Sequence, residues 1–131
     1  MEIFIDSSAF FILGDQDSEE GQEVKSFIYD RKLHLVTTNF ILGETLSLVT
    51  KRIGKAKGIE VGEIILKSGI VRVVYLDELL QEDAWKLYKR YKDKDFDFID
   101  ATSFVFCQRH GIREAVTLDR HFLQMGFKIY P

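Results

Sequence analysis

The feature that most constrains the fold of this chain is a regular alternation of short β-type runs with segments that have the apolar spacing of amphipathic helices. The expected strands are residues 2–5, 33–36, 70–76, 115–118 and 127–130. The expected helices are residues 18–32, 38–54, 59–67, 77–91 and 98–110, with a short helix before Gly126. Strands that alternate with helices form a parallel sheet covered by helices on both faces. The sequence therefore predicts the α/β class.

Length and composition indicate one domain over residues 1–131. With 46% hydrophobic residues and a single Pro, the chain does not fit the disordered or fibrous classes. It can bury roughly two thirds of its unfolded surface without disulfides. Its start carries Glu2, Asp6 and Asp15 among apolar residues and has no basic segment, and no apolar run reaches the about 18 residues of a membrane span. We expect a cytoplasmic protein without membrane contact.

Acidic residues end several of the expected strands. Asp6 follows Ile3-Phe4-Ile5, Asp119 follows the strand at 115–118, and Asp77 follows the strand at 70–76. Ligands of open α/β sheets bind beyond the carboxyl ends of the strands, so these residues are candidates for a site. Each also has an ordinary interpretation as a helix cap, and Asp77, followed by Glu78 and two leucines, fits that interpretation best.

Two further acids stand in apolar surroundings. Glu44 lies within Phe40-Ile41-Leu42-Gly43-Glu44-Thr45-Leu46, and Asp100 lies between Phe98-Ile99 and Ala101. A buried carboxylate needs a partner. The ordinary alternatives are that Glu44 lies on a solvated helix face and that Asp100 caps a helix. Four such residues converging on one sheet edge favour a shared function over four independent structural roles.

Converging carboxylates require a cation, because two unit charges 4 Å apart repel by about 4 kcal/mol at an effective dielectric near 20. The chain has one Cys and three His (His34, His110 and His121) that are far apart in sequence, which argues against zinc. We expect an ion bound by oxygen alone, Mg²⁺ or Mn²⁺, as used in phosphodiester hydrolysis.

The formal net charge of −3 does not exclude a polyanionic substrate. Setting the four candidate ligands aside leaves 17 acidic residues against 18 basic ones. Basic residues also gather at 51–57 and 86–94, where a solvated helix face is the simplest interpretation.

Four motifs, in this order and spacing, resemble those of the PIN-domain family, particularly the small VapC-type ribonuclease toxins, over essentially the whole chain. They are Phe4-Ile5-Asp6-Ser7-Ser8, Thr38-Asn39 followed by Glu44, Asp100-Ala101-Thr102-Ser103-Phe104, and Thr117-Leu118-Asp119-Arg120-His121-Phe122 before Gly126-Phe127. The resemblance implies a three-layer α/β/α sandwich around a parallel sheet of about five strands. It also implies a metal-dependent endoribonuclease, the toxin of a type II toxin–antitoxin pair.

The resemblance assigns roles within one acidic pocket. Asp6 and Asp100 would be the principal ligands of Mg²⁺ or Mn²⁺, and Asp119 and Glu44 would bind a second ion or orient the attacking water. Their expected hydrogen-bonding neighbours are Ser8, Asn39 and Thr117. One position departs from the family, because Asp97 stands where Ser or Thr is common. The implied partners are an RNA substrate, an antitoxin whose tail enters the acidic groove, and a second copy in a homodimer.

Two other functions compete with this interpretation. A non-catalytic PIN-like module would bind RNA without cutting it, although all four acids are retained. A phospho-acceptor signalling domain would use Asp77 as its acceptor, but such a domain needs paired acids after the first strand, where Asp6 is followed by Ser7, and a Lys beyond the last strand, whereas Lys128 lies within it.

Overall fold

The computed structural model describes residues 2–15 and 17–131, which form a five-stranded parallel sheet with helices on both faces. The strand order is β3-β2-β1-β4-β5. The strands are β1 (Glu2–Ile5), β2 (His34–Thr38), β3 (Val71–Val74), β4 (Glu114–Val116) and β5 (Lys128–Tyr130). The helices are α1 (Ser7–Leu13), α2 (Glu19–Arg31), α3 (Asn39–Arg52), α4 (Lys55–Lys67), α5 (Glu78–Arg90), α6 (Phe98–Arg109) and α7 (His121–Gln124).

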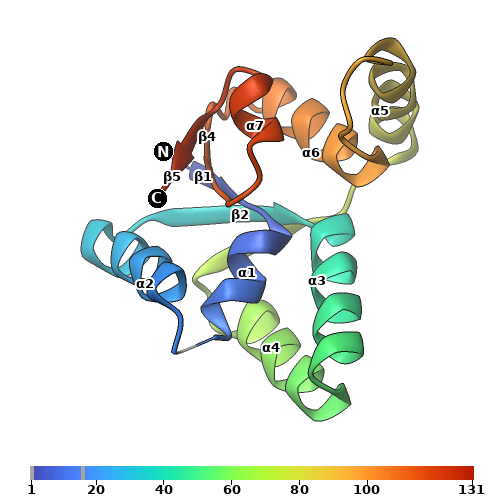
Figure 1. Ribbon diagram of the computed structural model, residues 1–131. Coiled ribbons are helices and arrows are strands. Elements are labelled where there is room, and N and C mark those ends of the chain that lie inside the picture. Colours follow the sequence, from blue (N-terminus) through green and yellow to red (C-terminus); the bar gives the residue numbers. More distant parts are fainter. Residues whose placement is uncertain (1, 16) are drawn as a thin grey trace.

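The helices form two layers, as a parallel sheet requires (Figure 1). Helices α1 to α4 cover one face of the sheet, and α5, α6 and α7 lie on the other. The central strand β1 is apolar on both sides, and Ile3, Phe4 and Ile5 are all buried. The ring of Phe4 stacks on that of Phe122 with the centroids 5.8 Å apart. The predicted three-layer α/β/α sandwich is confirmed.

The order of the strands reverses beside β1. The chain runs outward from β1 to β2 and β3, then returns to place β4 on the other side of β1. Ile5 is paired with Val116, and the Asp6 N–H donates to the Val116 carbonyl at 3.1 Å. The segments that leave β1 and β4 therefore diverge from neighbouring points, and such a switch point is where open α/β sheets bind ligands.

Helix α1 is not among the helices that the sequence predicts, the first of which was expected at residues 18–32. The helix begins at Ser7, directly after β1, and has only seven residues. Its run Ala9-Phe10-Phe11-Ile12-Leu13 is too short and too uniformly apolar to show helical periodicity. Ala9 and Phe10 are buried in the core.

Helix α4 begins at Lys55, four residues before the expected start, because Gly58 lies within it and does not break it. Helices α3 and α4 approach closely there, and a Cβ at Gly58 would be 2.8 Å from the Thr50 hydroxyl oxygen. Strand β4 ends at Val116, two residues earlier than expected. In the part of the chain that the structure describes, none of the helices combines the length and apolarity of a membrane span.

Gly21 provides a stability test of the packing of α1 against α2. A Cβ there would lie 2.5 Å from the Ile12 carbonyl oxygen and 2.7 Å from the Asp15 carbonyl oxygen. We expect Gly21→Ala to lower the free energy of unfolding by about 2 kcal/mol, measured by urea denaturation.

Gly43→Ala is the matched control, since Gly43 is exposed in α3 and, its own helix aside, no described heavy atom lies within 4 Å of an added Cβ. That variant is expected to gain roughly 0.5–1 kcal/mol from helix propensity. Equal effects of the two substitutions would show that the α1–α2 contact is not close.

Candidate metal centre

Four acidic side chains from separate parts of the sequence line one cavity of about 360 Å³ at the switch point. Asp6 follows β1, Glu44 lies in α3, Asp100 lies in α6, and Asp119 lies in the segment after β4. Asp97 lines the same cavity. The structure thus brings together the four acids that the sequence analysis selected as metal ligands.

Asp6 is the most deeply buried of the four, with 3% of its surface exposed. Its Oδ2 atom accepts hydrogen bonds from Thr117 Oγ1 at 3.0 Å and Ser8 Oγ at 3.2 Å. Burial raises the pKa of Asp6 from 3.8 to about 6, and the charges of Asp119 and Glu44 add to the rise although hydrogen bonds oppose it. The two hydroxyls hold the carboxylate in place, and among the described residues no Lys, Arg or His forms an ion pair with it.

Ser8 and Thr117 fix the two segments that leave the sheet. Ser8 Oγ accepts from the Leu118 N–H at 3.0 Å, and Thr117 Oγ1 accepts from the Asp119 N–H at 2.9 Å. Both hydroxyls also donate to Asp6, so they connect the loop after β4 to the residue after β1. Both hydroxyls therefore lie beside the acids, in the position that was predicted for them.

Asp100 and Asp97 form a capping box at the start of α6. The Asp100 N–H donates to Asp97 Oδ1 at 2.9 Å, and the Asp97 N–H donates to Asp100 Oδ2 at 3.0 Å. Burial raises the pKa of Asp100 to about 8, with further contributions from the charges of Asp97, Asp119 and Asp6. Ser, Thr and Asp are all good N-cap residues, which explains how Asp97 can stand where the resemblance implied Ser or Thr.

Glu44 projects from α3 toward α1. Its Oε1 atom accepts a hydrogen bond from the Ser7 hydroxyl. Partial burial raises the pKa of Glu44, and the charges of Asp97 and Asp119 add to this effect. An acid in an apolar helix thus faces the cavity and is held there by a partner from α1, the helix that the sequence analysis missed.

Two other polar residues have structural roles. The Asn39 Oδ1 atom accepts from the Leu76 N–H at 2.9 Å, which ties the start of α3 to the segment after β3, so its side-chain oxygen does not have the predicted place beside the acids. Asp77 is exposed and caps α5 by accepting from the Leu80 N–H at 2.9 Å. This cap leaves the phospho-acceptor hypothesis without support at its proposed acceptor.

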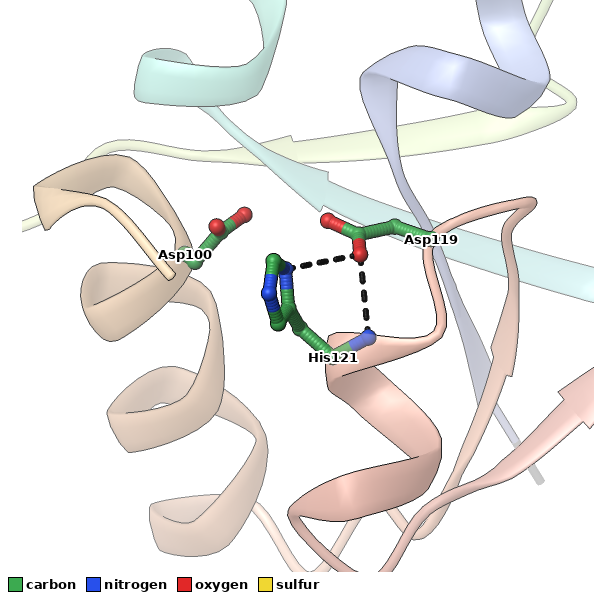
Figure 2. A group of neighbouring side chains, drawn as sticks. All are labelled: Asp100, Asp119 and His121. Carbon is green, nitrogen blue, oxygen red and sulfur yellow. Dashed lines mark hydrogen bonds and ion pairs between the residues drawn. The ribbon is translucent and has the colours of Figure 1, made fainter. Parts of the chain in front are cut away.

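His121 is the site residue that sequence reasoning missed. Asp100, Asp119 and His121 offer ligand atoms that all lie within 4.8 Å of one another, and Figure 2 shows the imidazole between the two carboxylates. Asp119 Oδ1 accepts the backbone N–H of His121 at 2.9 Å, and the ring lies beside the carboxylates of Asp119 and Asp100. The structure therefore offers a nitrogen ligand where oxygen ligands alone were expected. In the sequence, only the position of His121 two residues after Asp119 could have indicated this proximity, and that spacing alone does not assign a role.

The charges around the cavity fit a divalent cation. Among the described residues that line it, Arg52 is the one Lys or Arg, against five carboxylates. Such a donor set, rich in hard oxygen atoms, suits Mg²⁺ or Mn²⁺. Burial, with a smaller contribution from the neighbouring acids, raises the pKa values of Asp6 and Asp100, and a cation beside them would stabilise their ionised forms.

Comparisons with known proteins agree on one family. The PIN domain profile matches residues 3–128. The chain is 32% identical over 125 residues, 95% of each chain, to the 23S rRNA-specific endonuclease VapC20 of Mycobacterium tuberculosis. The crystal structure of that organism's VapC20, titled a sarcin-ricin loop cleaving toxin, matches with a TM-score of 0.88 and 30% identity, covering 98% of this chain and 99% of that one.

A more distant structure shares the fold alone. VapBC2 of Rickettsia felis, bound to a DNA fragment from its promoter, matches with a TM-score of 0.76 at 10% identity, covering 98% of this chain and 97% of that one.

The raised pKa values predict a pH-dependent stability in the presence of EDTA. An acid whose pKa is higher in the folded state contributes stability at low pH, and this contribution is lost as the pH rises through the folded pKa. For Asp6 the rise from 3.8 to about 6 corresponds to about 3 kcal/mol. The loss falls between about pH 4 and pH 8, set by Asp6 and Asp100.

Asp100→Asn isolates one part of this loss, because the amide does not ionise. We expect the variant to gain stability over the wild type progressively from about pH 4 to about pH 8, as measured by urea denaturation in EDTA. A difference between the two proteins that is independent of pH would contradict the raised pKa of Asp100.

Proposed function

Because the chain belongs to the PIN domain family, as a VapC-type endoribonuclease, we propose that it cuts RNA at the acidic cavity of the switch point. The observation that supports this site is the convergence of four carboxylates there, two of them with strongly raised pKa values. The residues that would hold Mg²⁺ or Mn²⁺ are Asp6, Asp100, Asp119 and Glu44. When bound, such an ion activates water for attack and stabilises negative charge on the phosphate.

The protein's own contribution is to fix these carboxylates before substrate binds. Asp6 is held by two hydroxyls, Asp100 by the capping box, and Asp119 by the N–H of His121. Ligands that are held in place by other side chains need little reorganisation when they bind, which is the electrostatic preorganisation that catalysis requires.

Glu44 is suited to orient the attacking water or accept its proton. It approaches the cavity from α3, and its Ser7 hydrogen bond directs the carboxylate. Its pKa is raised by burial, and a base whose pKa lies nearer to the operating pH is the more effective proton acceptor. Asp119, in this proposal, binds the ion from the opposite segment, after β4.

The substrate that we propose is ribosomal RNA. The support is the 32% identity to VapC20, a 23S rRNA-specific endonuclease, over 95% of both chains. We therefore expect the protein to act in the cytoplasm, where ribosomes lie.

Asp100→Asn tests the assignment of the site. We expect cleavage of purified 23S rRNA in Mn²⁺ to fall about 100-fold or more, because the amide is a poor ligand for a hard cation, while the protein stays folded. EDTA is expected to abolish cleavage by the wild type.

Asp77→Asn is the matched control for the same chemical change. Asp77 is an exposed helix cap, and Asn caps equally well, so cleavage is expected to stay within about twofold of the wild type. Full activity of Asp100→Asn, or activity of the wild type in EDTA, would contradict the proposed site.

Arg52 is proposed to contact a substrate phosphate. It lines the cavity, and its guanidinium lies 5.3 Å from the centre of the Phe11 ring. We expect Arg52→Ala to raise the KM for RNA about fivefold with little change in kcat, and to lower the salt dependence of RNA binding by about one ion. Lys51→Ala, which removes a neighbouring exposed charge, is the control. Equal effects of the two substitutions would show that Arg52 acts only through the general positive charge of this surface.

We also propose two protein partners. The first is a cognate antitoxin, supported by the VapBC complexes among the structures that share this fold. The second is another copy of this chain. Its support is an aromatic cluster in which the exposed rings of Trp85 and Tyr88 of α5 lie beside the partly buried Phe98 of α6, since solvent-exposed aromatic side chains are typical of interfaces.

A further inference from the structure

The contact between His121 and Asp119 lacks the geometry of a hydrogen bond. His121 Nδ1 lies 2.9 Å from Asp119 Oδ1, yet this buried nitrogen has no hydrogen-bond partner among the described residues. The same oxygen already accepts the backbone N–H of His121. When Nδ1 carries no proton, two electron-rich atoms face each other at close range, an arrangement that is unfavourable unless a positive charge lies near both.

The separation of the two atoms suits ligands of one ion. Neighbouring ligands of an octahedral ion with bonds of 2.0–2.1 Å are about 3 Å apart. The ligand atoms of Asp100, Asp119 and His121 all lie within 4.8 Å of one another, so the three form a group that could hold one ion after a small adjustment of the side chains. In Figure 2 the imidazole lies between the two carboxylates, which come from α6 and from the segment before α7.

The ring is held in this position by the fold. His121 is the first residue of α7, and the turn made by Asp119 fixes its backbone. The buried ring of Phe96 packs edge-on against the imidazole, with the centroids 6.5 Å apart. The turn and the ring contact thus hold His121 beside the two carboxylates.

We propose that His121 Nδ1 is a ligand of the divalent ion on the Asp100–Asp119 side of the cavity. This inference rests on the proposed function and adds a nitrogen to a set of ligands otherwise made of oxygen. Imidazole suits transition metals, whereas Mg²⁺ prefers oxygen ligands. The mixed site therefore selects Mn²⁺ over Mg²⁺, and His121 is the residue that sets this preference.

The test is pulsed electron paramagnetic resonance of the wild-type protein loaded with Mn²⁺. A directly bound imidazole gives nitrogen modulation of the Mn²⁺ signal, and labelling the protein with ¹⁵N-histidine changes that modulation without any substitution. We expect the modulation in the wild type and in His110→Gln. His110 is the matched control because its Nδ1 lies 2.9 Å from the Phe106 carbonyl oxygen in α6.

His121→Gln is expected to lose the nitrogen modulation and to bind Mn²⁺ about tenfold more weakly, with Mg²⁺ affinity changed less than about threefold. Titration calorimetry measures both affinities, and circular dichroism confirms that the variant is folded. The isotope experiment on the wild type does not depend on the folding of any variant.

Two outcomes would overturn the proposal in distinguishable ways. Mn²⁺ binding by the wild type without histidine-derived modulation would show that His121 is an ion-pair partner of Asp119 and not a ligand, and would leave the carboxylate site intact. Failure of the wild type to bind Mn²⁺ at all would contradict the proposed metal centre together with the role of His121.

Discussion

Repulsion among carboxylates at the switch point is the constraint on which the rest of the site depends. Asp6, Asp100, Asp119 and Glu44 line one cavity, and burial with mutual repulsion raises the pKa of Asp6 to about 6 and of Asp100 to about 8. The fold brings these charges together at a cost in stability. A bound ligand of opposite charge would recover this lost stability. A hard divalent cation is the ligand that matches the carboxylate oxygens.

The topology decides which residues meet. Because β4 returns to the side of β1, Asp6 and the segment of Asp119 leave the sheet from adjacent positions, while α3 and α6 approach from its two faces. Local devices then fix each carboxylate: hydroxyls for Asp6, a capping box for Asp100, and the Ser7 hydroxyl for Glu44. Asp97, and not Asp100 as expected, is the N-cap of α6. Asp100 completes the capping box by accepting the Asp97 N–H with one oxygen, while its side chain still faces the cavity.

Sequence reasoning succeeded where several acids were expected at one edge of the sheet. Asp6, Glu44, Asp100 and Asp119 do line one cavity, whereas Asp77, which also follows a strand, only caps a helix. Sequence reasoning failed where the outcome depended on tertiary contacts. Helix α1 is too short to show a period, Gly58 is tolerated inside α4 because α3 packs closely there, and Asn39 bonds to Leu76, which is remote in sequence. His121 joins the cluster through a turn whose geometry the residue types alone do not specify.

The most direct measurement of the central claim is anomalous diffraction at the manganese absorption edge from crystals grown with Mn²⁺. We expect an anomalous peak inside the cavity, within about 2.3 Å of carboxylate oxygens that include those of Asp6 or Asp100. Crystals with Mn²⁺ present and no anomalous peak among these side chains would contradict the claim that the fold assembles them to hold a metal ion.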